Sequence, residues 1–529
     1  MTISVIVASA LLVWGSAADL PSQRAPHTQR ASTAPVSVIE EVSALFDAGD
    51  LARAGALVDR ALQEYPSDAA LLNLAGAIDA QQGRYAAAER HFKASIDADR
   101  RLAAAYMNLG RLYQEHAAGD PAAPRKALAV YRQLLTIDPS RSEALFQAAY
   151  LSACIGDWAS SREWLDRLPL DVRSRPQTLA VLAVDAAGLG DRAQATRTAN
   201  ALAGHPELAE QDVLAIVPAL DVAKDDALAD QLLSALEQRH LASAASLRQL
   251  GTVNVRLGRL DRARQSFDRA FDAGGPRLPI LVDLARVAYK QKDFEGALGY
   301  LAHARNLDAK NAEVHFLFGL ACVELNLGAE AFDALRKAVA LAPENAYVNY
   351  AMGAVAIHRH EPAEALPYFE KYVRLEPDDP RGRFALGAAR FYSSDLDGAR
   401  QDLQRAARAP ETAAGAHYFL AKIARQQEDL KTAAVEIGGA LAANPRYADA
   451  LAEQGLIETR LGQFAAAERS LQEALASDPE NYAATVNLAA LYARMRDPRR
   501  DELKARLDAL QDKRAAAAQE FLRIVQVVQ

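Results

Sequence analysis

The sequence lacks the short motifs by which many enzymes and metal sites are recognised. It contains no G-x-S-x-G, no G-x-x-x-x-G-K-[ST], no G-x-G-x-x-G, no H-E-x-x-H and no C-x-x-C. Cysteine is also scarce, since Cys154 and Cys322 are the only two in 529 residues. We therefore expect no enzymatic activity, no cofactor and no metal site, and we interpret both cysteines as packing residues.

An excess of one charge and a membrane-spanning hydrophobic run are absent as well. The net charge is -8 in 529 residues, so neither nucleic acid nor anionic lipid is expected as the main partner. The apolar run Ile3–Trp14 is too short to cross a bilayer, which takes about 20 residues. We expect no integral membrane span. Half of the residues are hydrophobic and 24% are charged, which is typical of a soluble helical protein.

The N-terminus has features of a signal peptide. The apolar run is followed by small residues at 15–18, spaced like a signal-peptidase site, although no Lys or Arg precedes it. We predict a signal peptide over 1–18 and a flexible linker over 19–34, which is rich in Pro, Ser, Thr, Ala and Gln. The protein would then be exported, to the periplasm or cell envelope of a bacterial host. The alternative is a cytoplasmic protein that begins with an ordinary apolar helix.

A period of 34 residues runs through most of the chain. Pro343, Pro377, Pro445 and Pro479 are separated by multiples of 34. We number each repeat unit so that position 1 is the third residue after this proline. Small residues then recur at two positions. Position 8 is Gly251, Ala285, Gly319, Gly353, Gly387, Ala421, Gly455 and Ala489, and position 20 is Ala263, Ala297, Ala331, Ala365, Ala399, Ala433 and Ala467. Small side chains let helices approach closely, so both positions indicate helix–helix contacts.

Each unit contains the pattern of two helices. Apolar residues at positions 4, 7, 8 and 11 follow one helix face, and positions 20, 24 and 27 follow a second. Helix-capping aspartates are predicted at position 16, before the second helix: Asp50, Asp157, Asp191, Asp225, Asp293 and Asp429. Basic residues at position 13 suit the negative end of the first helix: Arg256, Lys290, His358, Arg460 and Arg494. The proline then ends the second helix.

The clearest unit reads "LAEQGLIETRLGQFAAAERSLQEALASDPENY" and resembles the tetratricopeptide repeat, a 34-residue helix-turn-helix. The signature places are held by Leu451, Gly455, Gly462, Phe464, Ala467, Leu471, Ala474 and Pro479. The resemblance implies an all-α solenoid, a right-handed superhelix of about 14 units over residues 35–515, with a C-terminal capping helix over 516–529. The units are predicted to start at 35, 69, 103, 142, 176, 210, 244, 278, 312, 346, 380, 414, 448 and 482. The unit at 103 is five residues longer than the others, and the unit at 210 matches the pattern least well.

Aromatic residues recur at position 5 of four successive units: Phe316, Tyr350, Phe384 and Tyr418. This position lies about 110° from the apolar stripe, so packing on the paired helix does not by itself require an aromatic residue there. In the family, positions 2, 5, 9, 12 and 13 face the groove, which adds Tyr347, Phe391 and Tyr392. We predict that these seven residues bind a peptide segment. The alternative is that their rings fill gaps between neighbouring first helices.

These features predict a non-catalytic scaffold or adaptor that binds a protein or peptide partner in the concave groove of the repeat array. One alternative is an accessory structural subunit of an envelope machine for secretion, pilus assembly or polysaccharide export, held through a large interface. Another is an intracellular regulator. The sequence names neither the partner nor the oligomeric state.

Overall fold

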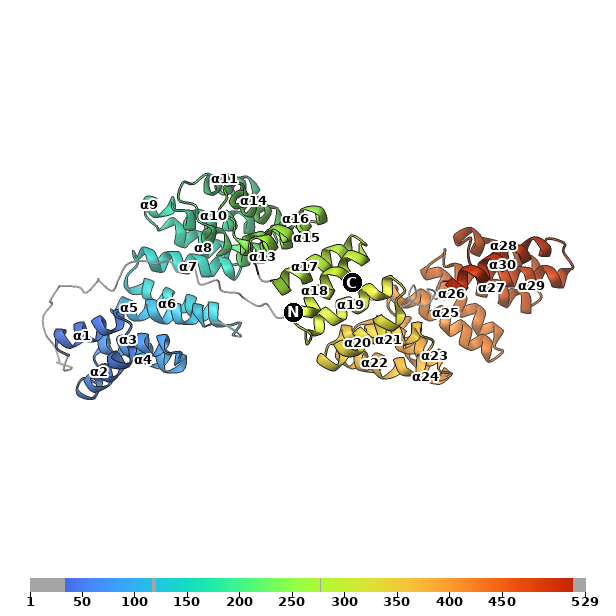
Figure 1. Ribbon diagram of the computed structural model, residues 1–529, viewed down its shortest axis with the longest axis horizontal. Coiled ribbons are helices and arrows are strands. Elements are labelled where there is room, and N and C mark those ends of the chain that lie inside the picture. The colour runs from blue at the N-terminus through green and yellow to red at the C-terminus, as the bar shows by residue number, and fades with distance from the viewer. Residues whose placement is uncertain (1–33, 117–119, 276, 517–529) are drawn as a thin grey trace. The chain divides into compact units, whose positions relative to one another are not determined.

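The computed structural model describes residues 34–116, 120–275 and 277–516, and these ranges contain helices and turns but no strand (Figure 1). The predicted signal peptide, and most of the linker and of the capping helix, lie outside the described residues. Consecutive helices pack on one another along the chain. The expected all-α arrangement in helix pairs is therefore confirmed, while the handedness of the superhelix and the number of units stay predictions.

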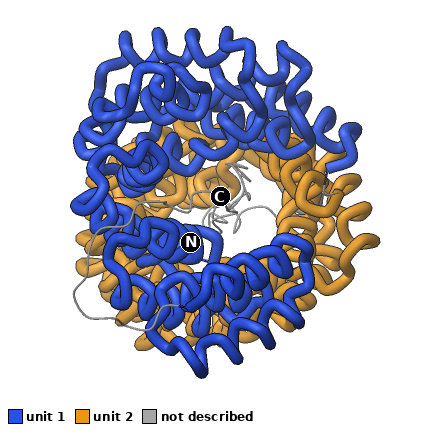
Figure 2. Tube along the Cα trace, turned by 90° about the vertical axis from the view of Figure 1, so that its left-hand side faces the viewer, with its two compact units in different colours: residues 1–276 blue, residues 277–529 orange. Residues whose placement is uncertain are grey.

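The chain forms two compact units, residues 1–276 and 277–529 (Figure 2). The described part of the first unit contains helices α1 (Val36–Asp47), α2 (Leu51–Glu64), α3 (Ala69–Gln81), α4 (Tyr85–Ala98), α5 (Ala103–Glu115), α6 (Ala123–Ile137), α7 (Ser142–Cys154), α8 (Trp158–Asp166), α9 (Leu170–Arg173), α10 (Pro176–Gly188), α11 (Arg192–Ala203), α12 (Glu210–Leu214), α13 (Val217–Ala223), α14 (Asp226–Gln238), α15 (Ala244–Arg256) and α16 (Leu260–Asp272).

The described part of the second unit contains helices α17 (Arg277–Lys290), α18 (Phe294–Leu307), α19 (Ala312–Glu324), α20 (Gly328–Leu341), α21 (Ala346–His358), α22 (Pro362–Leu375), α23 (Pro380–Tyr392), α24 (Leu396–Ala406), α25 (Pro410–Gln426), α26 (Leu430–Ala443), α27 (Ala448–Arg460), α28 (Phe464–Ser477), α29 (Tyr482–Met495) and α30 (Arg500–Ala516). None of the helices in the described part of the chain is both long and apolar enough to cross a membrane.

The predicted helix ends are confirmed. Asp50, Asp157, Asp191, Asp225, Asp293 and Asp429 each precede a helix, and each side chain accepts a hydrogen bond from the backbone N–H three residues later. The basic residues predicted at position 13 lie in the last turns of α15, α17, α21, α27 and α29. Local sequence therefore specifies where helices begin and end, because it satisfies the free backbone groups and the helix dipole.

The small residues at position 8 allow the two helices of a unit to touch. A Cβ added to Gly353 would lie 2.8 Å from the ring of Phe369, and one added to Gly455 would lie 2.5 Å from Leu471. Both large residues occupy position 24. The alanines predicted at position 20, such as Ala365, are fully buried. A large side chain on the second helix thus fits over a glycine on the first, which explains why the period is strict.

Three segments depart from the regular helix pairs. Helix α8 is short and Pro169 precedes the additional helix α9. The first helix of the unit at 210 is split into α12 and α13, with Pro218 in the first turn of α13. Helix α25 begins at Pro410, four residues before the predicted unit start. In each case a proline ends or begins a helix away from the regular place, because it lacks an N–H and fixes φ.

Candidate functional site

The seven predicted groove residues all lie in the second unit, on α19, α21, α23 and α25. Tyr350, Phe384 and Phe391 are 2%, 6% and 7% exposed, whereas Tyr347 and Tyr392 are each 43% exposed. Phe316 and Tyr418 are half-buried. The position-5 residues therefore do not form a continuous exposed row, a question that the sequence left open.

The two central members of the column are buried, and each packs against rings or backbone of another helix. The Tyr350 ring centroid lies 5.6 Å from that of Phe369 and 4.9 Å from that of Tyr372, both on α22. The Phe384 ring lies 6.0 Å from that of Phe419 on α25 and close to the backbone of Gly415. Phe384 thus contacts the first helix of the next repeat unit, as the gap-filling interpretation predicts, whereas the ring contacts of Tyr350 are with the second helix of its own repeat unit.

Around Tyr392 the structure brings aromatic residues and a cation together. We call Phe391, Tyr392, Tyr418, Phe419 and Lys422 the aromatic–lysine cluster. The Lys422 Nζ lies 5.2–5.9 Å from the centroids of all four rings. Each ring face carries negative charge density, so several rings hold the ammonium group in one place. The cluster is preorganised, and Tyr392 is its most exposed ring.

Acidic groups of α27, the first helix of the next repeat unit, lie near Tyr418 of this cluster. Burial, with Asp449 and Glu453 nearby, raises the pKa of Tyr418 far above its usual range, so its hydroxyl stays protonated. Glu453 is buried and pairs with Arg425. Tyr447 extends the aromatic surface, because its ring centroid lies 5.3 Å from that of Tyr418. The arrangement offers ring faces, hydroxyls and an ammonium group, which suit binding better than bond chemistry.

The other exposed tyrosine, Tyr347, lies beside a hydrogen-bonded group. Its ring contacts that of Tyr372 edge-on, with a centroid distance of 6.3 Å. The Tyr372 hydroxyl donates to Asp379 Oδ2 at 2.5 Å, and the Arg381 guanidinium pairs with the same carboxylate. The Arg381 guanidinium and the Tyr372 hydroxyl hold the pKa of Asp379 below its usual value despite partial burial. The exposed Tyr347 ring therefore packs against a tyrosine that is itself held by a hydrogen bond to Asp379.

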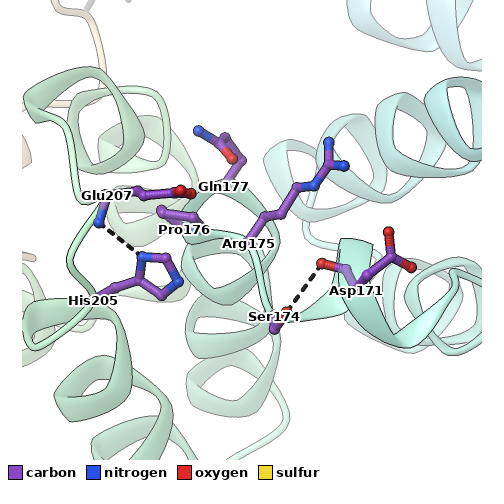
Figure 3. A pocket seen from close by; sticks show the side chains of 7 residues that line it. All are labelled: Asp171, Ser174, Arg175, Pro176, Gln177, His205 and Glu207. Carbon is purple, nitrogen blue, oxygen red and sulfur yellow. Dashed lines mark hydrogen bonds between the residues drawn. The ribbon is translucent and has the colours of Figure 1, made fainter.

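The first unit has a cavity of about 500 Å³ at the start of α10 (Figure 3). Its lining residues are Asp171, Ser174, Arg175, Pro176, Gln177, His205 and Glu207. The Ser174 hydroxyl donates to the backbone carbonyl of Asp171, and the backbone N–H of Glu207 donates to His205 Nδ1. These two hydrogen bonds stabilise local turns. Throughout the described ranges, no group of three or more His, Cys, Asp or Glu side chains is placed to hold a metal ion.

Sequence reasoning found the aromatic rings at Phe391, Tyr392 and Tyr418 but missed Phe419 and Lys422. Lys422 stands at position 9 of the unit predicted at 414, one of the positions that face the groove in the family. Position 9 was therefore the feature of the sequence from which Lys422 could have been predicted as a groove residue. No periodic signal distinguishes Phe419, whose ring contacts those of Phe384, Phe391 and Tyr392.

Comparison with known proteins bears on the family. The tetratricopeptide repeat model matches residues 39–101, 282–346, 350–413 and 453–499. Similar solved structures include the APC/C hetero-tetramer Cut9-Hcn1 (15% identity, 86% of this chain and 89% of that chain, TM-score 0.39) and yeast Tom70 (17%, 88% and 94%, 0.36). A third is PilW, a type IV pilus biogenesis factor (22%, 40% and 98%, 0.36). No curated protein matches the sequence significantly. The family matches and the paired helices together show that the chain contains tetratricopeptide repeats.

Proposed function

We propose that this protein is a non-catalytic scaffold that binds a segment of a partner protein on the second unit. The observation that carries the proposal is the aromatic–lysine cluster, in which Tyr392 is 43% exposed beside the Lys422 ammonium group. A ring that is already held in place loses little conformational entropy on binding, and tyrosines of this kind are frequent anchors in protein interfaces. Tyr347 is a second, separate contact on the same unit.

The test is affinity capture from an extract of the host, followed by mass spectrometry. We compare the wild type with a Tyr392→Ser, Lys422→Ser double variant. The control is Tyr85→Ser in the first unit, because Tyr85 is 42% exposed and also contacts an aromatic ring, that of His116. Circular dichroism establishes that all three proteins are folded.

We expect the wild type and the Tyr85→Ser control to retain the same protein, and the double variant to retain at least tenfold less of it. Loss of the partner from both variants would indicate a general defect. Equal retention by all three would place the interface elsewhere and refute the proposed site.

The burial of Tyr350 and Phe384 favours one alternative, a subunit held through a large interface without a peptide groove. In that case the partner would protect many helices of the second unit from hydrogen exchange. Protection confined to α23 and α25 supports the peptide-binding scaffold instead.

Export is proposed from the apolar run Ile3–Trp14 and from the small residues at 15–18 that follow it. The mass of the protein isolated from its host tests it, since processing would leave a chain that starts at Ala18 or Asp19. An unprocessed chain in the cytoplasm would support the intracellular regulator.

A further inference from the structure

The polar cavity at the start of α10 lies where two departures from the regular repeat meet. Asp171 on the additional helix α9 and Ser174 after it line one side, and His205 and Glu207, in the turn before the split helix α12–α13, line the other. The start of α10 lies between the two sides (Figure 3). A volume of about 500 Å³ lies within the range of about 300–1,000 Å³ that is typical of small-molecule sites.

Both sides of the cavity are held in place by arginines. On α9, Arg173 Nε donates to the backbone carbonyl of Leu168 at 2.8 Å. Behind the other side, Arg239 Nη1 donates to the carbonyls of Ala203 and His205 at 3.0 and 2.7 Å. The cavity is therefore preorganised, so a ligand would not have to order its walls.

Hydrogen bonds within the walls use donors and leave acceptors for a ligand. The Ser174 hydroxyl donates its only proton to the Asp171 backbone carbonyl, so towards a ligand its oxygen can only accept. Gln177 Nε2 donates to Asp212 Oδ1 at 2.7 Å, which leaves Gln177 Oε1 as an acceptor. Asp171 and Glu207 form hydrogen bonds through their backbones, and in the described ranges no hydrogen bond or ion pair involves either carboxylate.

The lining also carries an excess of negative charge. The backbone N–H of Glu207 donates to His205 Nδ1 at 3.1 Å, which requires this nitrogen to be unprotonated, so the imidazole is uncharged while the bond is made. The carboxylates of Asp171 and Glu207 then exceed the single guanidinium of Arg175. A ligand that is rich in donors and positively charged complements such a lining.

We propose that this cavity binds a guanidinium group, carried either by a free small molecule such as arginine or by an arginine side chain of a partner protein. A guanidinium offers five N–H donors in a planar fork that matches the geometry of carboxylates, whereas an ammonium group offers three. The five donors suit acceptors that stand on both sides of the cavity. The inference goes beyond the proposed function, because it concerns the first unit and a charged ligand.

The test is isothermal titration calorimetry of the full chain with two matched pairs of ligands. L-Arginine is compared with L-citrulline, and N-acetyl-L-arginine amide is compared with N-acetyl-L-citrulline amide. Citrulline has an uncharged urea group of nearly the same shape in place of the guanidinium. We expect the arginine compound of at least one pair to bind about tenfold more tightly than its citrulline counterpart, because hydrogen bonds between charged groups are about twice as strong as neutral ones.

The two pairs distinguish the sources of the guanidinium. Binding of free arginine without binding of the capped compound supports a small-molecule ligand, since only the free amino acid carries an α-carboxylate and an α-ammonium group. Binding of both compounds with similar affinity supports an arginine side chain of a partner, since the guanidinium is then the group that is recognised.

Variants locate the site. An Asp171→Asn, Glu207→Gln double variant keeps the shapes of both side chains and removes their charges, and we expect it to bind the arginine compound about tenfold more weakly. Glu163→Gln is the matched control, because Glu163 on α8 is also exposed but does not line the cavity. This control should bind the arginine compound as the wild type does, and circular dichroism establishes that both variants are folded.

Three results would overturn the inference: no saturable binding of either arginine compound, equal affinity for the citrulline compounds, or unchanged affinity in the folded double variant. The first two need only the wild type, so they stand even if the double variant fails to fold. None of these results bears on partner capture by the aromatic–lysine cluster, so failure here leaves the proposed function intact.

Discussion

The buried carboxyl group of Asp185 makes the stability of the first unit depend on pH. Asp185 lies on α10 and is 0% exposed. One of its oxygens accepts a hydrogen bond from Ser161 Oγ at 2.7 Å, and the other is buried without a hydrogen-bond partner. Burial raises the pKa of Asp185 from 3.8 to about 7, although the hydrogen bond from Ser161 and the charge of Arg162 act in the opposite direction. The folded protein therefore holds a proton on Asp185 that the unfolded chain releases near pH 4.

The difference between the pKa of Asp185 in the folded and the unfolded state sets the sign and the size of the pH effect on stability. Between about pH 4 and pH 7 the folded state binds one proton more than the unfolded state, so the free energy of unfolding falls as the pH rises. A pKa difference of about three corresponds to about 4 kcal/mol, since each pKa unit is worth about 1.4 kcal/mol. Asp185→Asn carries no charge at any of these pH values. Relative to the wild type, this variant should therefore gain about 4 kcal/mol of stability between pH 4 and pH 8.

Urea unfolding followed by tryptophan fluorescence measures this gain. Trp158 and Trp164 both lie on α8, and the Trp158 ring packs against Gly188 on α10, so their emission reports on the region around Asp185. Asp157→Asn is the control, because Asp157 is partly exposed and an asparagine caps α8 equally well. A stability difference between Asp185→Asn and wild type that stays constant from pH 4 to pH 8 would refute the reasoning.

Three further predictions concern helix packing, the burial of the two thiols and helix capping. Gly353→Ala should destabilise the second unit by about 1–3 kcal/mol, because the added Cβ would overlap the ring of Phe369. The control Gly438→Ala, where no atom lies within 4 Å of the added Cβ, should leave stability unchanged or raise it, and thermal unfolding followed by circular dichroism compares the two variants. Burial raises the pKa of Cys154 to about 12 and that of Cys322 to about 11, so both thiols should react slowly with iodoacetamide at pH 8 until guanidinium unfolds the chain. Mass spectrometry measures the labelling, and rapid labelling of the native protein would contradict this prediction. Asp429→Ala should weaken the protection of the first turn of α26 from hydrogen exchange, and Asp429→Asn should weaken it much less, because asparagine also caps a helix. Equal effects of the two substitutions would exclude the capping role.

The sequence by itself determined the local structure of this protein. The 34-residue period, the capping aspartates and the prolines specify helix pairs, because they depend on backbone hydrogen bonds and on contacts within one unit. The glycine at position 8 is also specified within one repeat unit. The large side chain that packs over it, such as Phe369 over Gly353, belongs to a residue 16 positions later in the same unit.

Only the tertiary structure decided which aromatic residues are exposed. The position of a residue on a single helix face indicates only that packing on the paired helix does not by itself require an aromatic residue at position 5, and it does not decide whether a ring there is buried. Phe384 is covered by Gly415 and Phe419 of α25, and Tyr350 by the α22 residues Phe369 and Tyr372, while Tyr392 at the end of α23 stays accessible.

Contacts between helices also decide the surroundings of several polar residues. Lys422 meets four rings contributed by α23 and α25, Asp185 is enclosed where α10 packs on α7 and α8, and Asn73 meets Asn108 across two helices. Periodicity within one unit contains no information on such contacts, because they arise where neighbouring units pack together.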